Sequence, residues 1–264
     1  MLKIENVFKT FNAGTVNEKK ALRGLNLHLK PGEFVTVIGG NGAGKSTMLN
    51  CVSGAYSVES GKILIDGNDV TNLPEYKRAK FIGRVFQDPM MGTAGNMWIE
   101  ENLALAARRG HARTLRSGIT KAEREEYREK LKILDLGLED RMTTKVGLLS
   151  GGQRQALTLL MATLQKPKLL LLDEHTAALD PKTAAKVLEA TQRIVSKDNL
   201  TTMMITHNMR DAIAYGNRLI MMYDGHIVVD VSGEEKKNLT VEQLLNLFSQ
   251  ASGSDEVDDK LVLG

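Results

Sequence analysis

The stretch "PGEFVTVIGGNGAGKSTMLNCVSG", from Pro31 to Gly54, decides the fold. A turn leads into a continuous apolar run typical of a buried strand, then into a glycine-rich segment and a short helix that Gly54 would end. The segment 39–46 matches the phosphate-loop pattern G-x-x-x-x-G-K-[ST] and lies between a predicted strand and a predicted helix, as that motif requires. A plain glycine-rich turn would not need the Lys-Ser-Thr ending, so we expect a nucleotide-binding α/β fold.

The glycines would let backbone N–H groups turn inward around phosphate oxygens, and the N-terminus of the following helix adds a favourable dipole. We expect Lys45 to reach the β- and γ-phosphates, Ser46 to bind Mg²⁺ and Thr47 to bind the α-phosphate. The predicted ATP-binding loop consists of Gly39, Gly40, Asn41, Gly42, Ala43, Gly44, Lys45, Ser46 and Thr47.

A pair of carboxylates follows a second apolar run, "LLLLDE", residues 169–174. A buried parallel strand that ends at Asp173 would place this carboxylate at the carboxyl edge of the sheet, beside the phosphate loop. We expect Asp173 to hold Mg²⁺, through water, and Glu174 to be the catalytic base that polarises the attacking water. Such pairs also occur after strands by chance. Because the same chain carries a phosphate loop, we favour a metal-binding and catalytic role for this pair.

Strands alternate with helices along most of the chain, which favours a mostly parallel sheet. Residues 88–150 are helical and charged, and they read as a subdomain inserted into the core. We predict a phosphate-loop NTPase core with an antiparallel β subdomain and this helical subdomain, all within residues 1–250. The acidic tail 251–264 is predicted to be disordered.

Composition excludes several classes. The 264 residues carry a net charge of +3 with basic and acidic residues interleaved, so no nucleic-acid-binding stripe is expected. One cysteine, Cys51, excludes an internal disulfide framework and a cysteine zinc cluster. No run of eighteen apolar residues is present, so any membrane role would be exercised from the cytoplasmic face through a partner.

A second glycine-rich turn, "LSGGQRQAL" at 149–157, precedes a predicted helix with Ser150 as its N-cap. With it, the chain resembles the ATP-binding cassette family over about residues 2–245. The motifs in order are "GGNGAGKST", Gln87 in "VFQDP", "LSGGQRQAL", "LLLLDE", "AALD" and His207 in "ITHN". Six motifs in the family's order make coincidence negligible.

The resemblance implies a head-to-tail dimer of two copies of this chain. Each ATP would be bound between the phosphate loop of one copy and Ser150, Gly151, Gly152 and Gln153 of the other. A serine hydroxyl, glycine N–H groups and a helix N-terminus form an anion site, which agrees with that role. The second turn would therefore bind the partner's nucleotide.

Other family positions carry over one at a time. Phe11 matches the aromatic residue that stacks on adenine, with simple core packing as the less favoured alternative. Gln87 matches the glutamine that touches Mg²⁺ and links the core to the helical subdomain. His207 matches the histidine that contacts the γ-phosphate and completes the catalytic set with Glu174. Asp180 matches the aspartate at the dimer interface, and it also reads as a helix N-cap before Pro181.

One position departs from the family pattern. His175 stands where proline is common, two residues after Asp173. Losing the proline frees a backbone N–H and adds local flexibility, which is expected to alter the rate of hydrolysis without abolishing it.

We expect an ATPase subunit that powers uptake of a small, amino acid-like solute through separate permease chains, together with an extracytoplasmic solute-binding protein. The stretch 90–98 after Gln87 holds methionines and the only tryptophan, and it is predicted to contact the permease; a loop buried in the subdomain is the alternative. A non-transport cassette ATPase, in cofactor assembly or cell division, stays open as the other functional class.

Overall fold

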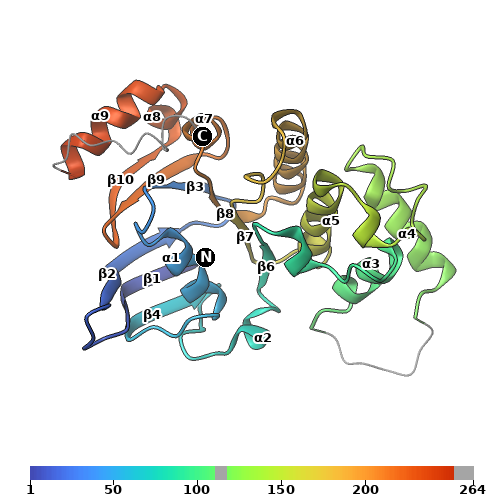
Figure 1. Cartoon of the computed structure of the whole chain (residues 1–264), viewed down its shortest axis with the longest axis horizontal. Coiled ribbons are helices and arrows are strands. Elements are labelled where there is room, and N and C mark those ends of the chain that lie inside the picture. Colours follow the sequence, from blue (N-terminus) through green and yellow to red (C-terminus); the bar gives the residue numbers. More distant parts are fainter. Residues whose placement is uncertain (111–117, 253–264) are drawn as a thin grey trace.

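Two sheets share one apolar core in the computed structural model, which describes residues 1–110 and 118–252 (Figure 1). The six-stranded sheet has the order β10-β9-β3-β8-β7-β6. Its strands are β3 Phe34–Ile38, β6 Ile82–Val85, β7 Leu169–Asp173, β8 Thr201–Ile205, β9 Arg218–Tyr223 and β10 His226–Ser232. All neighbouring pairs are parallel except β9 with β10. The predicted mostly parallel sheet is confirmed.

The smaller sheet is antiparallel throughout, in the order β2-β1-β4-β5. Its strands are β1 Leu2–Phe11, β2 Lys19–Leu29, β4 Ser60–Ile65 and β5 Asn68–Asp69. Alternating burial along β1 and β2 gives this sheet one apolar face. That face joins helix α1, Lys45–Ser53, and the larger sheet in one cluster of buried residues, so the phosphate-loop helix is fixed by both sheets.

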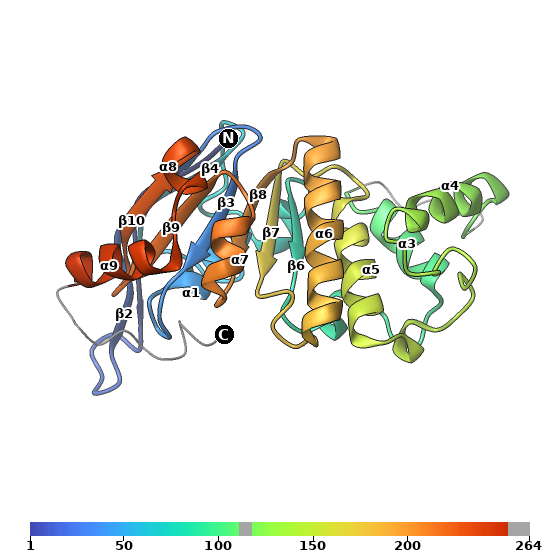
Figure 2. The same ribbon diagram turned by 90° about the horizontal axis from the view of Figure 1, so that it is seen from above.

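The helical segment between β6 and β7 lies at the end of the molecule opposite β10 (Figures 1 and 2). It contains α3 Ile99–Ala107, α4 Lys121–Lys132 and α5 Gly151–Thr163, with short 3₁₀ turns at Pro89–Gly92 and Val146–Leu148. These helices share a second apolar cluster with α6, Pro181–Asp198. The remaining helices are α2 Glu75–Arg78, α7 Met209–Ala214, α8 Gly233–Lys237 and α9 Val241–Ser252.

The helix ends agree with the local sequence signals. Gly54 ends α1 in a left-handed conformation with φ 88°. Thr120 and Ser150 each begin a helix with a capping box, and Asp180 caps α6 ahead of Pro181. The hairpin turn at 224–225 has positive φ at both residues, as its Asp-Gly sequence favours. These signals worked because each satisfies backbone groups that the helix or strand leaves unpaired.

Two strands end shortly before residues that the sequence singled out. Strand β6 ends at Val85, which leaves Gln87 exposed beyond the sheet, and β8 ends at Ile205, two residues before His207. The segment 253–264, most of the predicted disordered tail, lies outside the described residues. Within the described ranges, no helix combines the length and apolar character needed to cross a bilayer.

A buried arginine holds the far end of α1. Arg78 is 2% exposed, and its guanidinium donates to the carbonyl oxygens of Cys51 and Val52 in the last turn of α1 at 2.7 and 2.9 Å. It also donates to the carbonyls of Leu73 and Thr71. A cation at a helix C-terminus is favourable, and these four acceptors compensate for its burial.

We predict that Arg78→Leu lowers the free energy of unfolding by about 3 kcal/mol, because the substitution leaves buried carbonyls without a donor. Urea denaturation monitored by circular dichroism measures this. The control is Lys77→Leu, an exposed position on the same helix, which should change stability by less than about 0.5 kcal/mol. Equal stability of the two variants would show that Arg78 does not anchor α1.

Candidate functional site

The phosphate loop connects β3 to α1 and depends on glycine at specific points. A Cβ at Gly39 would lie 2.2 Å from the carbonyl oxygen of Met222, and one at Gly44 would lie 2.6 Å from that of Ala21. Both residues have positive φ, at 148° and 103°. Larger residues would therefore push the loop away from the sheets and displace the N-terminus of α1.

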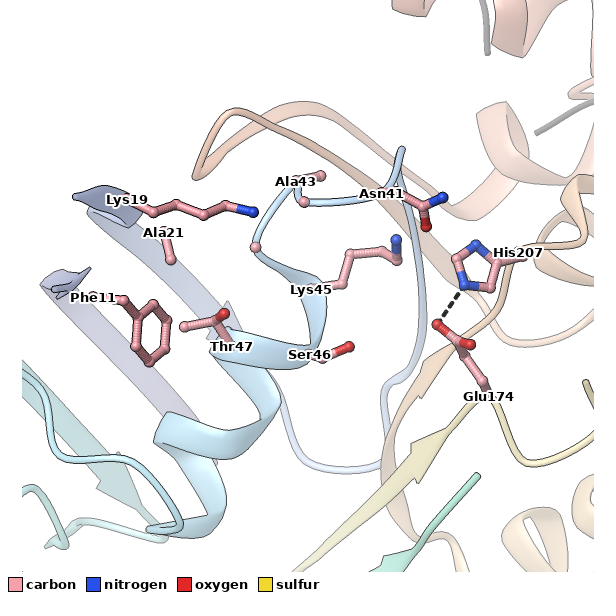
Figure 3. Close-up of a pocket in the computed structure, with 12 residues that line it drawn as sticks. Phe11, Lys19, Ala21, Asn41, Ala43, Lys45, Ser46, Thr47, Glu174 and His207 are labelled. Atoms are coloured by element: carbon pink, nitrogen blue, oxygen red, sulfur yellow. Dashed lines mark ion pairs between the residues drawn. The ribbon is translucent and has the colours of Figure 1, made fainter. Parts of the chain in front are cut away.

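The loop forms one wall of a pocket (Figure 3). Its lining residues are Phe11, Lys19, Ala21, Asn41, Gly42, Ala43, Gly44, Lys45, Ser46, Thr47, Glu174 and His207. The structure thus brings together residues that the sequence placed more than 190 positions apart, on β1, the phosphate loop, and the segments after β7 and β8. The N-terminus of α1 faces this space, which favours an anionic ligand.

Lys45 is buried inside the loop. Its ammonium donates to the carbonyl oxygens of Gly39 at 2.7 Å and Gly40 at 3.1 Å. Burial lowers the pKa of Lys45, and the nearby charges of Glu174 and Asp173 oppose that shift. The two carbonyls hold the cation where it can exchange them for phosphate oxygens.

Glu174 and His207 meet on the opposite wall of the pocket (Figure 3). The Glu174 Oε1 atom lies 2.5 Å from His207 Nε2. Glu174 has φ 47°, an unusual left-handed conformation for this residue type, and its backbone N–H donates to the carbonyl of Ile205 at 3.1 Å. The predicted catalytic pair is therefore in contact, with its carboxylate directed into the pocket.

Asp173 ends β7 as predicted and lies beside Arg84 of β6. Its Oδ2 atom is 3.5 Å from Arg84 Nη2, and Arg84 also donates to Asn50 of α1 at 2.7 Å. Burial raises the pKa of the Asp173 carboxyl, and the positive charge of Arg84 opposes that shift. The sequence did not single out Arg84, because a lone arginine within a strand carries no motif.

The residues present fit a magnesium site completed by a nucleotide. Ser46 and Asp173 supply a hydroxyl and a carboxylate, the hard oxygen donors that Mg²⁺ prefers. No cluster of three or more histidine, cysteine or acidic residues with metal-binding geometry occurs in the described part of the chain. A cation here would therefore need phosphate oxygens and water to complete its shell.

Phe11 lines the pocket at the end of β1, as expected of an adenine platform. Its ring meets Tyr56 edge-on at 5.4 Å between centroids, and Lys9 Nζ lies 5.3 Å from the ring centre. Phe11 is half-exposed, which leaves part of the ring for a ligand. Gln87 is exposed after the end of β6, outside the residues that line this pocket.

The second glycine-rich turn lies at a different hollow, lined in part by Ser150, Gly152 and Gln153 together with Lys182 and Thr183 of α6. The Ser150 hydroxyl accepts from the Gln153 backbone N–H at 3.3 Å, and the Gln153 side chain accepts from the Ser150 N–H at 3.2 Å. Gly152 packs so closely on α6 that a Cβ would lie 1.9 Å from Thr183 Cγ2. The turn is therefore fixed to α6, away from this chain's own phosphate loop.

Two more predicted positions flank that hollow. A Cβ at Gly151 would lie 3.4 Å from the side chain of Leu179, so this position also faces the segment before α6. Asp180 is exposed and accepts a hydrogen bond from the Thr183 N–H at 3.1 Å, which confirms its capping role.

The β9–β10 hairpin touches the phosphate loop. The backbone N–H of Gly225 donates to the carbonyl of Ala43 at 3.1 Å, and the carbonyl of Gly225 accepts from Arg23 of β2 at 3.2 Å. Asp224 adds an ion pair to the Arg23 side chain at 2.6 Å. The tip of this hairpin thus links β2 to the loop.

Lys19 is a pocket residue that the sequence analysis missed. It begins β2, and its ammonium lies over the loop, 3.1 Å from the position that a Cβ of Gly42 would occupy (Figure 3). Its neighbour Lys20 is also exposed, and the alternation of side chains along a strand puts it on the other face. The only sequence signal was this alternation, which cannot show which lysine faces the loop.

The known proteins that this chain resembles are named as ATP-binding proteins, in agreement with the pocket around the phosphate loop. Residues 22–177 match the family described as ABC transporter. The chain is 46% identical over 251 residues to a tyrosine transport ATP-binding protein of Clostridioides difficile, covering 95% of this chain and 100% of that protein. It is 34% identical to a phosphonates import ATP-binding protein of Alcaligenes faecalis, covering 87% and 82% of the two chains.

Solved structures match over most of their length. One is a dimeric ATP-binding cassette in a post-hydrolysis state with ADP and phosphate, with TM-score 0.75, 32% identity and coverage of 88% of this chain and 98% of that one. Another is cbiO1 of Clostridium perfringens, described as part of an ABC transporter complex, with TM-score 0.75, 25% identity and 94% coverage of both chains.

We predict that Lys19→Gln weakens ATP binding roughly five-fold, because it removes a partly exposed cation beside the phosphate loop. Isothermal titration calorimetry with ATP and with adenosine measures this, and adenosine binding should change less. Lys20→Gln removes the same charge from the other face and should bind ATP as the wild type does. Equal weakening by both variants would indicate a general charge effect.

Proposed function

The chain belongs to the ABC transporter family, and we propose on that premise that it powers uptake of a small, amino acid-like solute through separate permease chains. It is the subunit that hydrolyses ATP for transport. The observation that carries the proposal is the end-to-end match with a tyrosine transport ATP-binding protein. The other open class, a non-transport cassette ATPase, has no comparable support among the proteins compared.

ATP would bind with its adenine against Phe11 and its phosphates in the loop. Lys45 then exchanges its carbonyl acceptors for phosphate oxygens, and Thr47 donates toward the α-phosphate. Ser46 and Asp173 would hold Mg²⁺, which when bound supplies charge neutralisation for the phosphates. Gln87, exposed in the segment after β6, would contact this group through its side-chain oxygen.

Glu174 is suited to act on the attacking water. Its side chain is 11% exposed, and one carboxylate oxygen contacts His207. The other oxygen can accept a proton from a water placed in line with the terminal phosphate. His207, at 35% exposure, lies where it can donate to that phosphate once ATP displaces the contact with Glu174.

Two copies are needed to complete each site. The turn at Ser150 is anchored on α6 and opens to a separate hollow from the phosphate loop, so one chain supplies two half-sites. Head-to-tail pairing would place each half-site against the complementary one, with the same surface used on both copies. A similar cassette has been solved as a dimer.

A surface beside the helical segment would contact the permease. We call it the methionine surface: it consists of Met90, Met91, Trp98 and Leu148, which are 46%, 70%, 42% and 74% exposed. The segments that carry it are joined by the Gly147 N–H bond to the Gly95 carbonyl at 2.8 Å. Met97, by contrast, is half-buried, so the loop is neither wholly core nor wholly exposed.

On this proposal the protein would act at the cytoplasmic face of the membrane as a peripheral subunit. Its partners would be a second copy of itself, integral permease chains and an extracytoplasmic solute-binding protein. Charged residues of both signs alternate along the sequence, which gives no reason to invoke nucleic acid.

We predict that Glu174→Gln binds ATP but hydrolyses it on the order of 100-fold more slowly, because the amide cannot accept the proton. ATP should accumulate in the site and hold two copies together, since each triphosphate is bound from both sides. Phosphate release and analytical ultracentrifugation with Mg-ATP measure the two effects. Near-wild-type turnover would remove Glu174 from the mechanism.

The matched control adds Ser150→Arg to the Glu174→Gln chain. It should keep ATP binding, because Ser150 lies outside the phosphate-loop pocket, but it should remain monomeric. Loss of nucleotide binding by the monomer would instead place Ser150 in this chain's own site.

We predict that Met91→Asp leaves the ATPase activity of the isolated subunit within about two-fold of wild type while abolishing uptake, because a charge on an apolar docking surface opposes burial. Membrane vesicles that contain this chain and its permease, supplied with labelled tyrosine, test both this and the proposed function. Val16→Asp, at a fully exposed apolar position in the β1–β2 connection, should not affect uptake. ATP-independent uptake would contradict the function itself.

A further inference from the structure

His175 follows the proposed catalytic base and has no assigned role. The ring is 2% exposed, under α6, and its Nε2 atom lies 3.1 Å from Thr191 Oγ1. Thr191 is fully buried on α6. The sequence suggested only that position 175 loses the restraint of a proline. The structure shows that the histidine side chain also forms a buried link, which proline could not form.

Hydrogen-bond directions determine the state of this ring. The Thr191 hydroxyl donates its single proton to the carbonyl of Val187 at 2.8 Å. It must then accept from His175, so Nε2 carries the ring proton in this link. Burial lowers the pKa of His175 to about 4, which keeps the ring neutral at the pH of any ordinary assay.

The link between His175 and Thr191 restrains a segment in which the backbone conformation of Glu174 is unfavourable by itself. Glu174 has φ 47°, a conformation that a non-glycine residue keeps only when its surroundings impose it. Its N–H is bonded to Ile205 of β8, and its carbonyl accepts from the Ala177 N–H at 3.0 Å. The next side chain, His175, is tied to α6, so both sides of Glu174 are restrained.

The same helix restrains the far end of this segment. Asp180 caps α6 through the Thr183 N–H, and His175 reaches α6 at Thr191, which lies two turns further along. Residues 175–180 are thus fastened to α6 at both ends. A shift of α6 would be passed to the backbone of Glu174 through a short segment.

We propose that His175 is a positioning residue, whose hydrogen bond to Thr191 fixes the backbone of Glu174 so that its carboxylate stays at the hydrolytic position. This inference rests on the proposed function, because it assumes that Glu174 is the base. It adds a residue that acts through Glu174 and does not itself touch nucleotide.

The test measures steady-state ATP hydrolysis by the full chain, with kcat and KM determined separately. Thr191→Val removes the acceptor and keeps the shape, and it should lower kcat roughly ten-fold with KM changed less than about two-fold. Thr191→Ser keeps the hydroxyl and should restore kcat. Gln192→Ala, next along α6 but exposed, is the matched control and should behave as wild type.

A double variant separates positioning from folding. Thr191→Val leaves a buried ring N–H without an acceptor, so its melting temperature should fall as well. His175→Phe with Thr191→Val removes both partners, and should recover much of the melting temperature while kcat stays low. Recovery of kcat together with stability, or wild-type kcat in Thr191→Val, would overturn the proposal.

The role of Glu174 in the proposed function is tested separately by comparing ATP hydrolysis in the wild-type chain and Glu174→Gln. If the wild type hydrolyses ATP and Glu174→Gln is far slower, the catalytic role of Glu174 stands whatever the result for Thr191. If Glu174→Gln hydrolyses ATP as fast as the wild type, Glu174 is not the base, and the role proposed for His175 fails with it.

Discussion

Parallel pairing of β3, β8 and β7 is the constraint on which the site depends. The register sets Val37 of β3 and Asp173 of β7 against the same residue of β8, Ile205, so the three strands end at one level. Their continuations are the phosphate loop, the Glu174 segment and the His207 segment. Groups far apart in sequence meet because the carboxyl ends of parallel strands share an edge. Covering this sheet by α1 on one side and α6 on the other keeps that edge in place.

A second constraint keeps the two glycine-rich turns of the chain apart. Close packing of Gly152 on Thr183 fixes the Ser150 turn to α6, and α6 is packed on the sheet. The turn cannot approach its own phosphate loop without separating helix from sheet, which would expose the apolar cluster that they share. Held apart in this way, the two turns favour the proposed pairing between copies over closure within one chain.

Sequence signals predicted the parts of the site that carry a local motif. The phosphate loop, Asp173, Glu174 and His207 were placed because glycine spacing and strand ends determine their position along the chain. Lys19, Arg84 and the side-chain link of His175 were missed, since each depends on which residue of a distant strand or helix lies opposite. Helix caps were predictable because their partners are within four residues. The exposure of Met91 and Trp98 required the packing of the helical segment, which periodicity does not determine.

The hairpin between β9 and β10 looks like an ordinary surface turn, but Gly225 is bonded to Ala43 and to Arg23. Surface turns usually accept extra residues in the course of evolution at little cost. Here an insertion would lift the tip from the phosphate loop and break both bonds at once. Relatives should therefore vary freely in the length of the β1–β2 connection but keep this hairpin at constant length. Although the hairpin is far from the phosphate loop in sequence, its length should be as constant among relatives as that of the loop.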